Sequence, residues 1–223
     1  QELTYYGLDI YKKRMLPELL LRLSDIKGLE WIRLHYAYPS KFPLEILDAM
    51  KERENICNYL DMPLQHAANN MLKAMKRNIT REEMEELTAA IREKVPGICL
   101  RTTLIAGFPG ETEVEFKETF DFLHSLDISY LHVFTYSERD NTHALTLSPV
   151  VPMNVRHERN KTLRNLSYMK MQYFTEQHAG QTRKVLFEKN SKKDMMEGYT
   201  DNYIKITTPY RSEWANEIVE WKM

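Results

Sequence analysis

The feature that most constrains this chain is a repeated alternation of short apolar runs and longer segments with helical periodicity. The candidate strands are β-branched or aromatic runs at residues 31–36, 58–62, 99–106 and 130–134. The candidate helices place apolar side chains three or four positions apart at residues 15–26, 42–53 and 111–125. Parallel strands joined by helices curl or stack with right-handed crossovers. Residues 1–147 are therefore predicted to be an α/β domain built as a partial (βα) barrel of the TIM-like kind.

The alternation of strands and helices ends near the prolines of residues 149–152. After it, residues 155–179 are predicted to form one long, charged amphipathic helix that stops at Gly180. Four short strand-like runs separated by turn residues follow, at residues 183–187, 198–200, 203–207 and 217–221. We therefore expect a connector helix over residues 148–180 and a small all-β unit over residues 181–223.

Charge is balanced over the whole chain but uneven along it. The 223 residues include 31 basic and 32 acidic side chains, a net charge of −1, so no global field draws the protein to nucleic acid. Residues 155–194 nevertheless carry ten basic and four acidic side chains, a pattern that fits contact with RNA or a solvated helix face. No apolar run has the length of a membrane span, so we expect a cytoplasmic protein with no membrane partner.

The two cysteines, Cys57 and Cys99, lie far apart in the sequence and in apolar surroundings. Closely spaced cysteines would indicate a metal site, and a secreted chain would favour a disulfide. The pattern here predicts two reduced thiols buried in the core.

Functional groups in βα folds collect at the carboxyl ends of the strands, so the segments that follow the predicted strands are the candidates for a site. Gly107 lies in a strand-to-helix turn, where bare backbone can approach a ligand or simply make a tight turn. Gln65 and Arg77 bracket a short helix and offer an amide for hydroxyl groups and a guanidinium for a carboxylate.

A zinc site is a less well supported interpretation of the same segments. His35, Asp61 and His66 have the right chemistry for zinc, but they follow different strands and form no compact motif. We therefore predict no metal ligands among them. A metal-dependent barrel hydrolase remains the corresponding alternative function.

Five segments carry a resemblance to a known family. They are residues 1–7 (Gln-Glu-Leu-Thr-Tyr-Tyr-Gly), 33–39 (Arg-Leu-His-Tyr-Ala-Tyr-Pro), 59–66 (Tyr-Leu-Asp-Met-Pro-Leu-Gln-His), 101–112 (Arg-Thr-Thr-Leu-Ile-Ala-Gly-Phe-Pro-Gly-Glu-Thr) and 134–137 (Phe-Thr-Tyr-Ser). In this order they resemble the methylthiotransferase family of radical S-adenosylmethionine (radical SAM) enzymes. Gln65-His66 and Asp140-Asn141-Thr142 resemble its RimO-like branch, because the tRNA-modifying branch typically carries Gln-Ser-Gly-Ser and Arg-Pro-Gly-Thr there.

The resemblance implies a partial barrel that holds a 4Fe-4S cluster and S-adenosylmethionine, whose cleavage gives a 5'-deoxyadenosyl radical. The RimO-like branch adds a methylthio group to the β-carbon of an aspartate in a small-subunit ribosomal protein. By the same resemblance Gln65 contacts the ribose, Arg77 the methionine carboxylate, Thr103 and Gly107 the adenosine, and Tyr36 the cofactor. The terminal β unit resembles a truncated TRAM domain, and contact with the ribosome or its RNA is a further expectation.

One departure from the family is serious. The family's Cys-x3-Cys-x2-Cys loop is missing, and neither Cys57 nor Cys99 can replace it, since cluster ligation needs closely grouped thiolates. We expect the cluster cysteines upstream of residue 1 in a longer enzyme, and this chain to be inactive alone, with no catalytic residue identified. Two other functions stay open: a tRNA adenosine methylthiotransferase, and a non-catalytic scaffold that binds a ribosomal protein.

Overall fold

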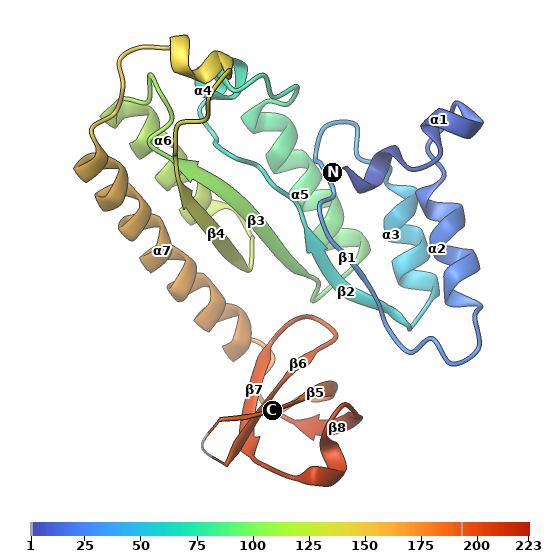
Figure 1. The fold of residues 1–223 in the computed structure, drawn as a ribbon. Helices are drawn as coiled ribbons and strands as arrows, with labels where there is room; N and C mark the ends of the chain where they lie inside the picture. The colour runs from blue at the N-terminus through green and yellow to red at the C-terminus, as the bar shows by residue number, and fades with distance from the viewer. Residues whose placement is uncertain (1, 193) are drawn as a thin grey trace.

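The computed structural model describes residues 2–192 and 194–223, without the side chains of residues 189–192, and contains two separate sheets (Figure 1). The first is parallel, with the strand order β1 (Ile32–Leu34), β2 (Ile56–Asp61), β3 (Cys99–Ala106), β4 (Tyr130–Thr135). Its helical elements are η1 (Leu3–Tyr5), α1 (Leu8–Tyr11), α2 (Leu16–Ser24), α3 (Glu45–Glu52), α4 (Asn69–Ala74), α5 (Arg81–Lys94) and α6 (Glu113–Ser125). The prediction of an α/β fold with a parallel sheet is confirmed.

The agreement between predicted and observed elements varies along the chain. β3 has the predicted bounds, whereas β1 is shorter than the predicted run of residues 31–36. The pattern did not single out α5, although the chain marks its start: Thr80 and Glu83 form a reciprocal capping box there.

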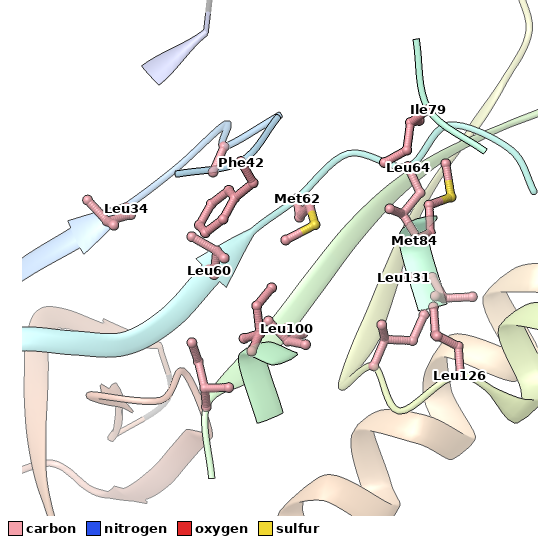
Figure 2. Packing of buried hydrophobic residues seen from close by; sticks show 14 of the residues in the cluster. Leu34, Phe42, Leu60, Met62, Leu64, Ile79, Met84, Leu100, Leu126 and Leu131 are labelled. Carbon is pink, nitrogen blue, oxygen red and sulfur yellow. The ribbon is translucent and has the colours of Figure 1, made fainter. Parts of the chain in front are cut away.

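Helices cover one face of the parallel sheet and leave the other partly open. Along β3 the side chains alternate, with Leu100 and Leu104 buried under helices and Arg101 and Thr103 half-buried on the opposite face. Figure 2 shows part of the core between sheet and helices, a single buried cluster that contains Leu60, Leu100 and Met84 of α5. We call the opposite surface the open face.

After β4 and the short η2 (His143–Thr146), the chain continues into the long helix α7 (Met153–Glu176), which packs along the outer edge of β4 (Figure 1). The second sheet is antiparallel, with the order β7 (Lys205–Pro209), β6 (Met195–Thr200), β5 (Thr182–Lys192), β8 (Ile218–Lys222) and a short η3 (Ser212–Trp214) before β8. The predicted long helix and the four predicted strands are therefore present.

The turn between β6 and β7 lies against the amino ends of the parallel strands. Tyr203 in this turn packs on Tyr59, with ring centroids 4.9 Å apart, and on Tyr130 at 6.2 Å. Arg33 stacks on the Tyr203 ring and donates to the carbonyls of Thr200 and Asp201 at 3.1 Å. The antiparallel sheet thus covers one end of the open face with aromatic side chains. Within the described residues, no helix is both long and apolar enough to cross a membrane.

Candidate functional site

A pocket of about 530 Å³ lies at the carboxyl ends of the parallel strands, on the open face. Four of the five predicted site residues line it: Tyr36, Gln65, Arg77 and Thr103. They come from the loops after β1 and β2, the segment after α4 and the middle of β3. Because parallel strands end at one edge of the sheet, residues from distant parts of the chain meet here.

The backbone at this pocket is held in unusual conformations. Tyr36, Gln65 and Lys76 all have positive φ angles, of 60°, 73° and 55°, and all three line the pocket. The Gln65 N–H donates to the carbonyl of Thr103 at 2.8 Å, and its carbonyl accepts from Ile105 at 3.0 Å. Positive φ costs a non-glycine residue free energy, so contacts like these are needed to hold it, and such strain concentrates at functional sites.

Arg77 carries the strongest signal for a ligand. Its Nε atom is buried without a hydrogen-bond partner, and its guanidinium lies over the Tyr38 ring at 5.7 Å. Within the described part of the chain, Arg77 forms no ion pair. A guanidinium with unused donors in a pocket is suited to bind a carboxylate or a phosphate.

An ion pair lies on the same face as Arg77. Arg101 contacts Asp61 at 2.9 Å and also His132, while Asp61 itself is buried. Loss of hydration on burial lowers the pKa of His132 and of His35 from the ordinary histidine value. Both imidazoles are therefore held toward the neutral form on this face.

His35, Asp61 and His66 take up three different environments. His35 packs on Tyr59 with ring centroids 5.3 Å apart, Asp61 pairs with Arg101, and His66 is buried beside Glu111. Among the described residues, no group of three or more histidine, cysteine or acidic side chains is arranged to hold a metal ion.

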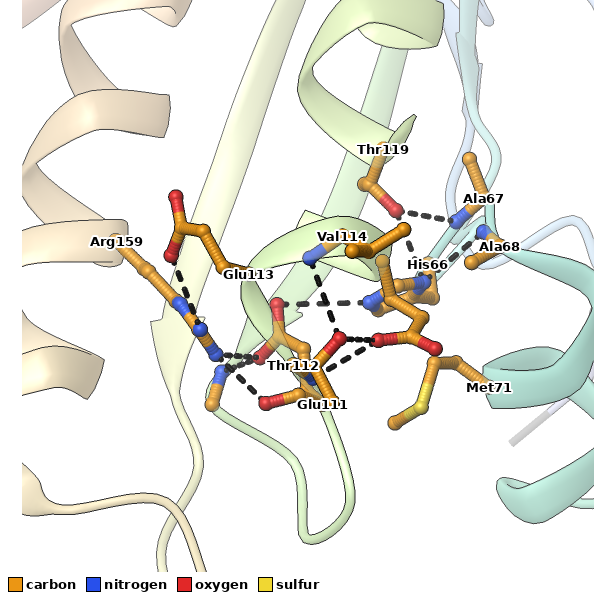
Figure 3. Close-up of polar contacts among 12 residues, drawn as sticks. His66, Ala67, Ala68, Met71, Glu111, Thr112, Glu113, Val114, Thr119 and Arg159 are labelled. Atoms are coloured by element: carbon orange, nitrogen blue, oxygen red, sulfur yellow. Dashed lines mark hydrogen bonds and ion pairs between the residues drawn. The ribbon is translucent and has the colours of Figure 1, made fainter. Parts of the chain in front are cut away.

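His66 belongs to a buried polar network behind the pocket (Figure 3). Its Nδ1 accepts the Ala68 N–H at 3.1 Å, so the ring proton is on Nε2, which faces Glu111 Oε1 at 3.6 Å. The Glu111 carboxylate also pairs with Arg159 of α7 at 3.4 Å and accepts the Gly107 N–H. The side chains of His66 and Glu111 are each 1% exposed. This network fixes the segment after β2 and the turn after β3 to α7.

Gly107 is the one predicted site residue that does not line the pocket. Its φ is +79°, and a Cβ atom there would lie 2.3 Å from Cγ of Arg156, a buried residue of α7. The structure therefore explains the glycine by close packing against α7. The prediction that Gly107 contacts a cofactor is not tested by this placement.

The pocket continues into a second one of about 460 Å³, and the two share Gln65, Thr103 and Phe134. The second pocket extends past the end of β4 to Ser137, Arg139 and Thr142. Together they form one cleft across the carboxyl ends of β2, β3 and β4. Sequence reasoning missed Arg101 and His132 as lining residues, although each precedes another lining residue by two positions on its strand.

The two cysteines lie at the other end of the open face, in the cluster that contains Tyr59 and Ile204. Both are free and buried, as predicted. Burial raises the pKa of the Cys57 thiol to about 11 and that of Cys99 to about 12. They are inert core thiols.

A family model described as the Radical SAM superfamily matches residues 2–123, more than half of the chain. The chain therefore belongs to the Radical SAM superfamily. This membership implies S-adenosylmethionine and an iron-sulfur cluster in the working enzyme.

Two similar curated proteins carry the same name. The ribosomal protein uS12 methylthiotransferase RimO of Cytophaga hutchinsonii is 50% identical over 189 residues, covering 85% of this chain and 43% of that protein. The protein of the same name from Bacteroides fragilis is 44% identical, with 85% of this chain and 44% of its own length covered. The chain thus spans less than half the length of these relatives.

Among solved structures, the coproporphyrinogen III oxidase HemN of Escherichia coli, a radical SAM enzyme, is similar with a TM-score of 0.47 and 20% identity. The similarity covers 73% of this chain and 36% of that one.

Proposed function

We propose that this chain is the S-adenosylmethionine-binding part of a methylthiotransferase. The enzyme adds a methylthio group to the β-carbon of an aspartate in a small-subunit ribosomal protein. The observation that carries the proposal is the pocket that joins Tyr36, Gln65, Arg77 and Thr103 and leaves Arg77 without an anionic partner. Family membership supports radical chemistry with S-adenosylmethionine, and the names of the relatives support methylthio transfer to a ribosomal protein.

The pocket residues fit S-adenosylmethionine. The unused Arg77 donors suit its carboxylate, the Gln65 amide suits the ribose hydroxyls, and Thr103 and Tyr36 border the space for the adenine. When bound, this cofactor supplies the radical chemistry and the methyl group. The protein's own part is to orient the cofactor, and the buried His66–Glu111 network holds the Gln65 segment in place for that task.

The described thiols do not fit an iron-sulfur cluster. Cys57 and Cys99 are buried, keep raised pKa values and lie at the end of the open face away from Arg77. Cluster ligation needs grouped thiolates, so these two cysteines serve packing.

The proposal also divides the chain into three parts. Residues 1–147 form a partial barrel, residues 148–180 a connector, and residues 181–223 a TRAM-like unit that helps to engage the substrate. A ribosomal substrate places the enzyme in the cytoplasm, and contact with ribosomal RNA follows from the same setting.

The first experiment measures S-adenosylmethionine binding to the purified chain by calorimetry. Arg77→Ala is expected to weaken binding by roughly 1 to 3 kcal/mol, the range for a charged hydrogen bond. Lys73→Ala is the matched control, because Lys73 is an exposed cation on α4 outside the pocket. Equal affinity of the Arg77 variant and the parent would reject the assignment.

The second experiment separates the ribosomal substrate from tRNA. Isolated small-subunit ribosomal proteins and bulk tRNA are each titrated against the chain. Selective binding of one ribosomal protein supports the proposal. Tight tRNA binding with a steep salt dependence, and no ribosomal protein bound, favours the tRNA-modifying function instead.

A further inference from the structure

A groove of about 800 Å³ lies between α7 and the outer edge of β4. Its α7 wall is a stripe of residues three or four positions apart, which we call the α7 stripe: His157, Lys161, Arg164, Tyr168 and Met171. Its other wall is formed by residues 131–133 of β4. No part of the function proposed above uses this groove.

The α7 stripe carries positive charge that the protein does not neutralise. None of the described residues lining the groove is acidic. Lys161 and Arg164 are exposed and form no ion pair within the described residues. Lys94 of α5 and Lys117 of α6, by contrast, are paired with Asp48 and Asp121. The groove therefore attracts an anionic partner.

The chemistry of the β4 edge decides between kinds of partner. The Ser167 hydroxyl accepts the Leu131 N–H at 2.9 Å and donates to the Leu131 carbonyl at 2.8 Å. The Asn160 amide donates to the Val133 carbonyl at 3.2 Å. Since these backbone groups are already occupied, an extended peptide cannot add to β4 as a further strand. The groove must recognise its partner through side chains.

An exposed aromatic ring completes the groove. Tyr168 lines it and is 66% exposed. Basic side chains alternating with an exposed ring are the combination by which proteins hold the phosphates and stack the bases of single-stranded nucleic acid.

The groove also leads to the cofactor pocket. His132 lines both, because its strand forms the wall between them. A single strand of nucleic acid lying along α7 would pass directly beside the cleft at the carboxyl ends of β3 and β4.

From these contacts we propose that the groove binds the phosphate backbone of single-stranded RNA, with Lys161 and Arg164 on phosphates and Tyr168 on a base. The inference rests on the proposed function only in taking the RNA as ribosomal RNA that flanks the target protein. The RNA-binding chemistry itself stands on the groove.

The test uses fluorescence anisotropy with a labelled single-stranded RNA of about 12 nucleotides, a length within the usual site sizes. The double variant Lys161→Gln/Arg164→Gln is expected to bind about tenfold more weakly at low salt. Its log–log salt slope should fall by about 1.4, since each phosphate contact on a single strand contributes about 0.7. The charge-matched control is Lys27→Gln/Lys51→Gln, which removes two exposed cations near α2 and α3 and should stay within about twofold of the parent.

A second pair of variants isolates stacking from charge. Tyr168→Ala is expected to weaken RNA binding about fivefold or more. Tyr173→Ala is the control, because Tyr173 is 64% exposed on the same helix but does not line the groove. Equal losses for both tyrosine variants, or equal losses for the Lys161/Arg164 and Lys27/Lys51 double variants, would overturn the site.

Two further outcomes also decide the inference. No RNA binding by the parent chain at about 50 mM salt would overturn it. Polyglutamate that competes as well as unlabelled RNA would also overturn it, because the groove would then be a general anion site. The groove variants should keep the parent's S-adenosylmethionine affinity, so a failure here is distinguishable from a failure of the pocket assignment.

Discussion

The two ends of the open face differ in what fills them. At the amino end, Tyr203 of the antiparallel sheet packs onto Tyr59 and Tyr130, and Arg33 stacks on the same ring. At the carboxyl end, a cleft remains between polar side chains, and Arg77 lacks an anionic partner. One face of one sheet thus serves packing at one end and leaves a polar cleft at the other.

The antiparallel sheet covers the amino end of the open face and leaves the carboxyl end of that face uncovered. The side chains at the amino end are aromatic and apolar, and burial raises the pKa of Tyr59 to about 12. Such groups stabilise the fold by staying dry. The polar groups at the carboxyl end contribute little to the free energy of folding while they are unpaired. Their donors and acceptors are available to a ligand.

Replacing one tyrosine at each end tests most directly whether the two ends differ in their contribution to stability. Tyr59→Ala removes a side chain that is 1% exposed and should lower the free energy of unfolding by about 4 kcal/mol. Tyr36→Ala removes one that is 52% exposed and should cost less than about 1 kcal/mol. Urea denaturation measures both values. Similar losses at the two ends would show that the open end is also a packing site.

Alkaline pH should act on the covered end. The pKa of Cys57 is raised above its unfolded value of 9.0 to about 11, because burial disfavours the thiolate. The stability from this thiol is fully present below pH 9 and is lost as the pH rises through 11. The expected loss is about 3 kcal/mol, at about 1.4 kcal/mol for each of the two pKa units.

Urea midpoints measured between neutral pH and high pH check this prediction. Cys57→Ala should make the midpoint less dependent on pH in this range, whatever its effect at neutral pH. A variant with the parent's full pH dependence would show that this thiol does not titrate in the folded state as proposed.

The smallest expected effect concerns the start of α6, just after the turn that borders the cleft. The Thr112 hydroxyl accepts the Val114 N–H at 3.2 Å and hydrogen-bonds to Glu115, which lowers the pKa of Glu115 to about 2. Thr112→Ala should cost about 1 kcal/mol at neutral pH. The stability from Glu115 is present above its ordinary pKa and is lost as the pH falls toward 2, so the difference should shrink in acid.

The control for this cap is another exposed threonine. Thr162 lies inside α7, and its hydroxyl only donates to the carbonyl of Glu158 at 3.0 Å. Thr162→Ala should therefore leave the unfolding free energy nearly unchanged, as alanine is the better helix former. A loss equal to that of Thr112→Ala would mean that capping is not the cause.

The sequence predicted much of the parallel sheet and four of the residues that line the candidate pocket. β3 has its predicted bounds because its run of apolar and β-branched residues lies between Gly97 and Gly107. Tyr36, Gln65, Arg77 and Thr103 meet because parallel strands bring their carboxyl ends to one edge. Local patterns and sheet geometry were sufficient for these features.

Contacts between distant segments were beyond the reach of those patterns. Gly107 is fixed by the side chain of Arg156, and nothing near either residue in sequence indicates that they meet. The packing of Tyr203 on Tyr59 joins the two sheets in the same way. Whether Arg77 has a partner also depends on the whole tertiary arrangement.

The sealed edge of β4 has a consequence for the behaviour of the protein at high concentration. An uncovered edge strand is a template on which another copy of the chain can add, which leads to aggregation. The Ser167 side chain bonds the N–H and the carbonyl of Leu131, and the Asn160 side chain bonds the carbonyl of Val133. The parallel sheet can therefore end at β4 without another copy of the chain adding to it through that edge.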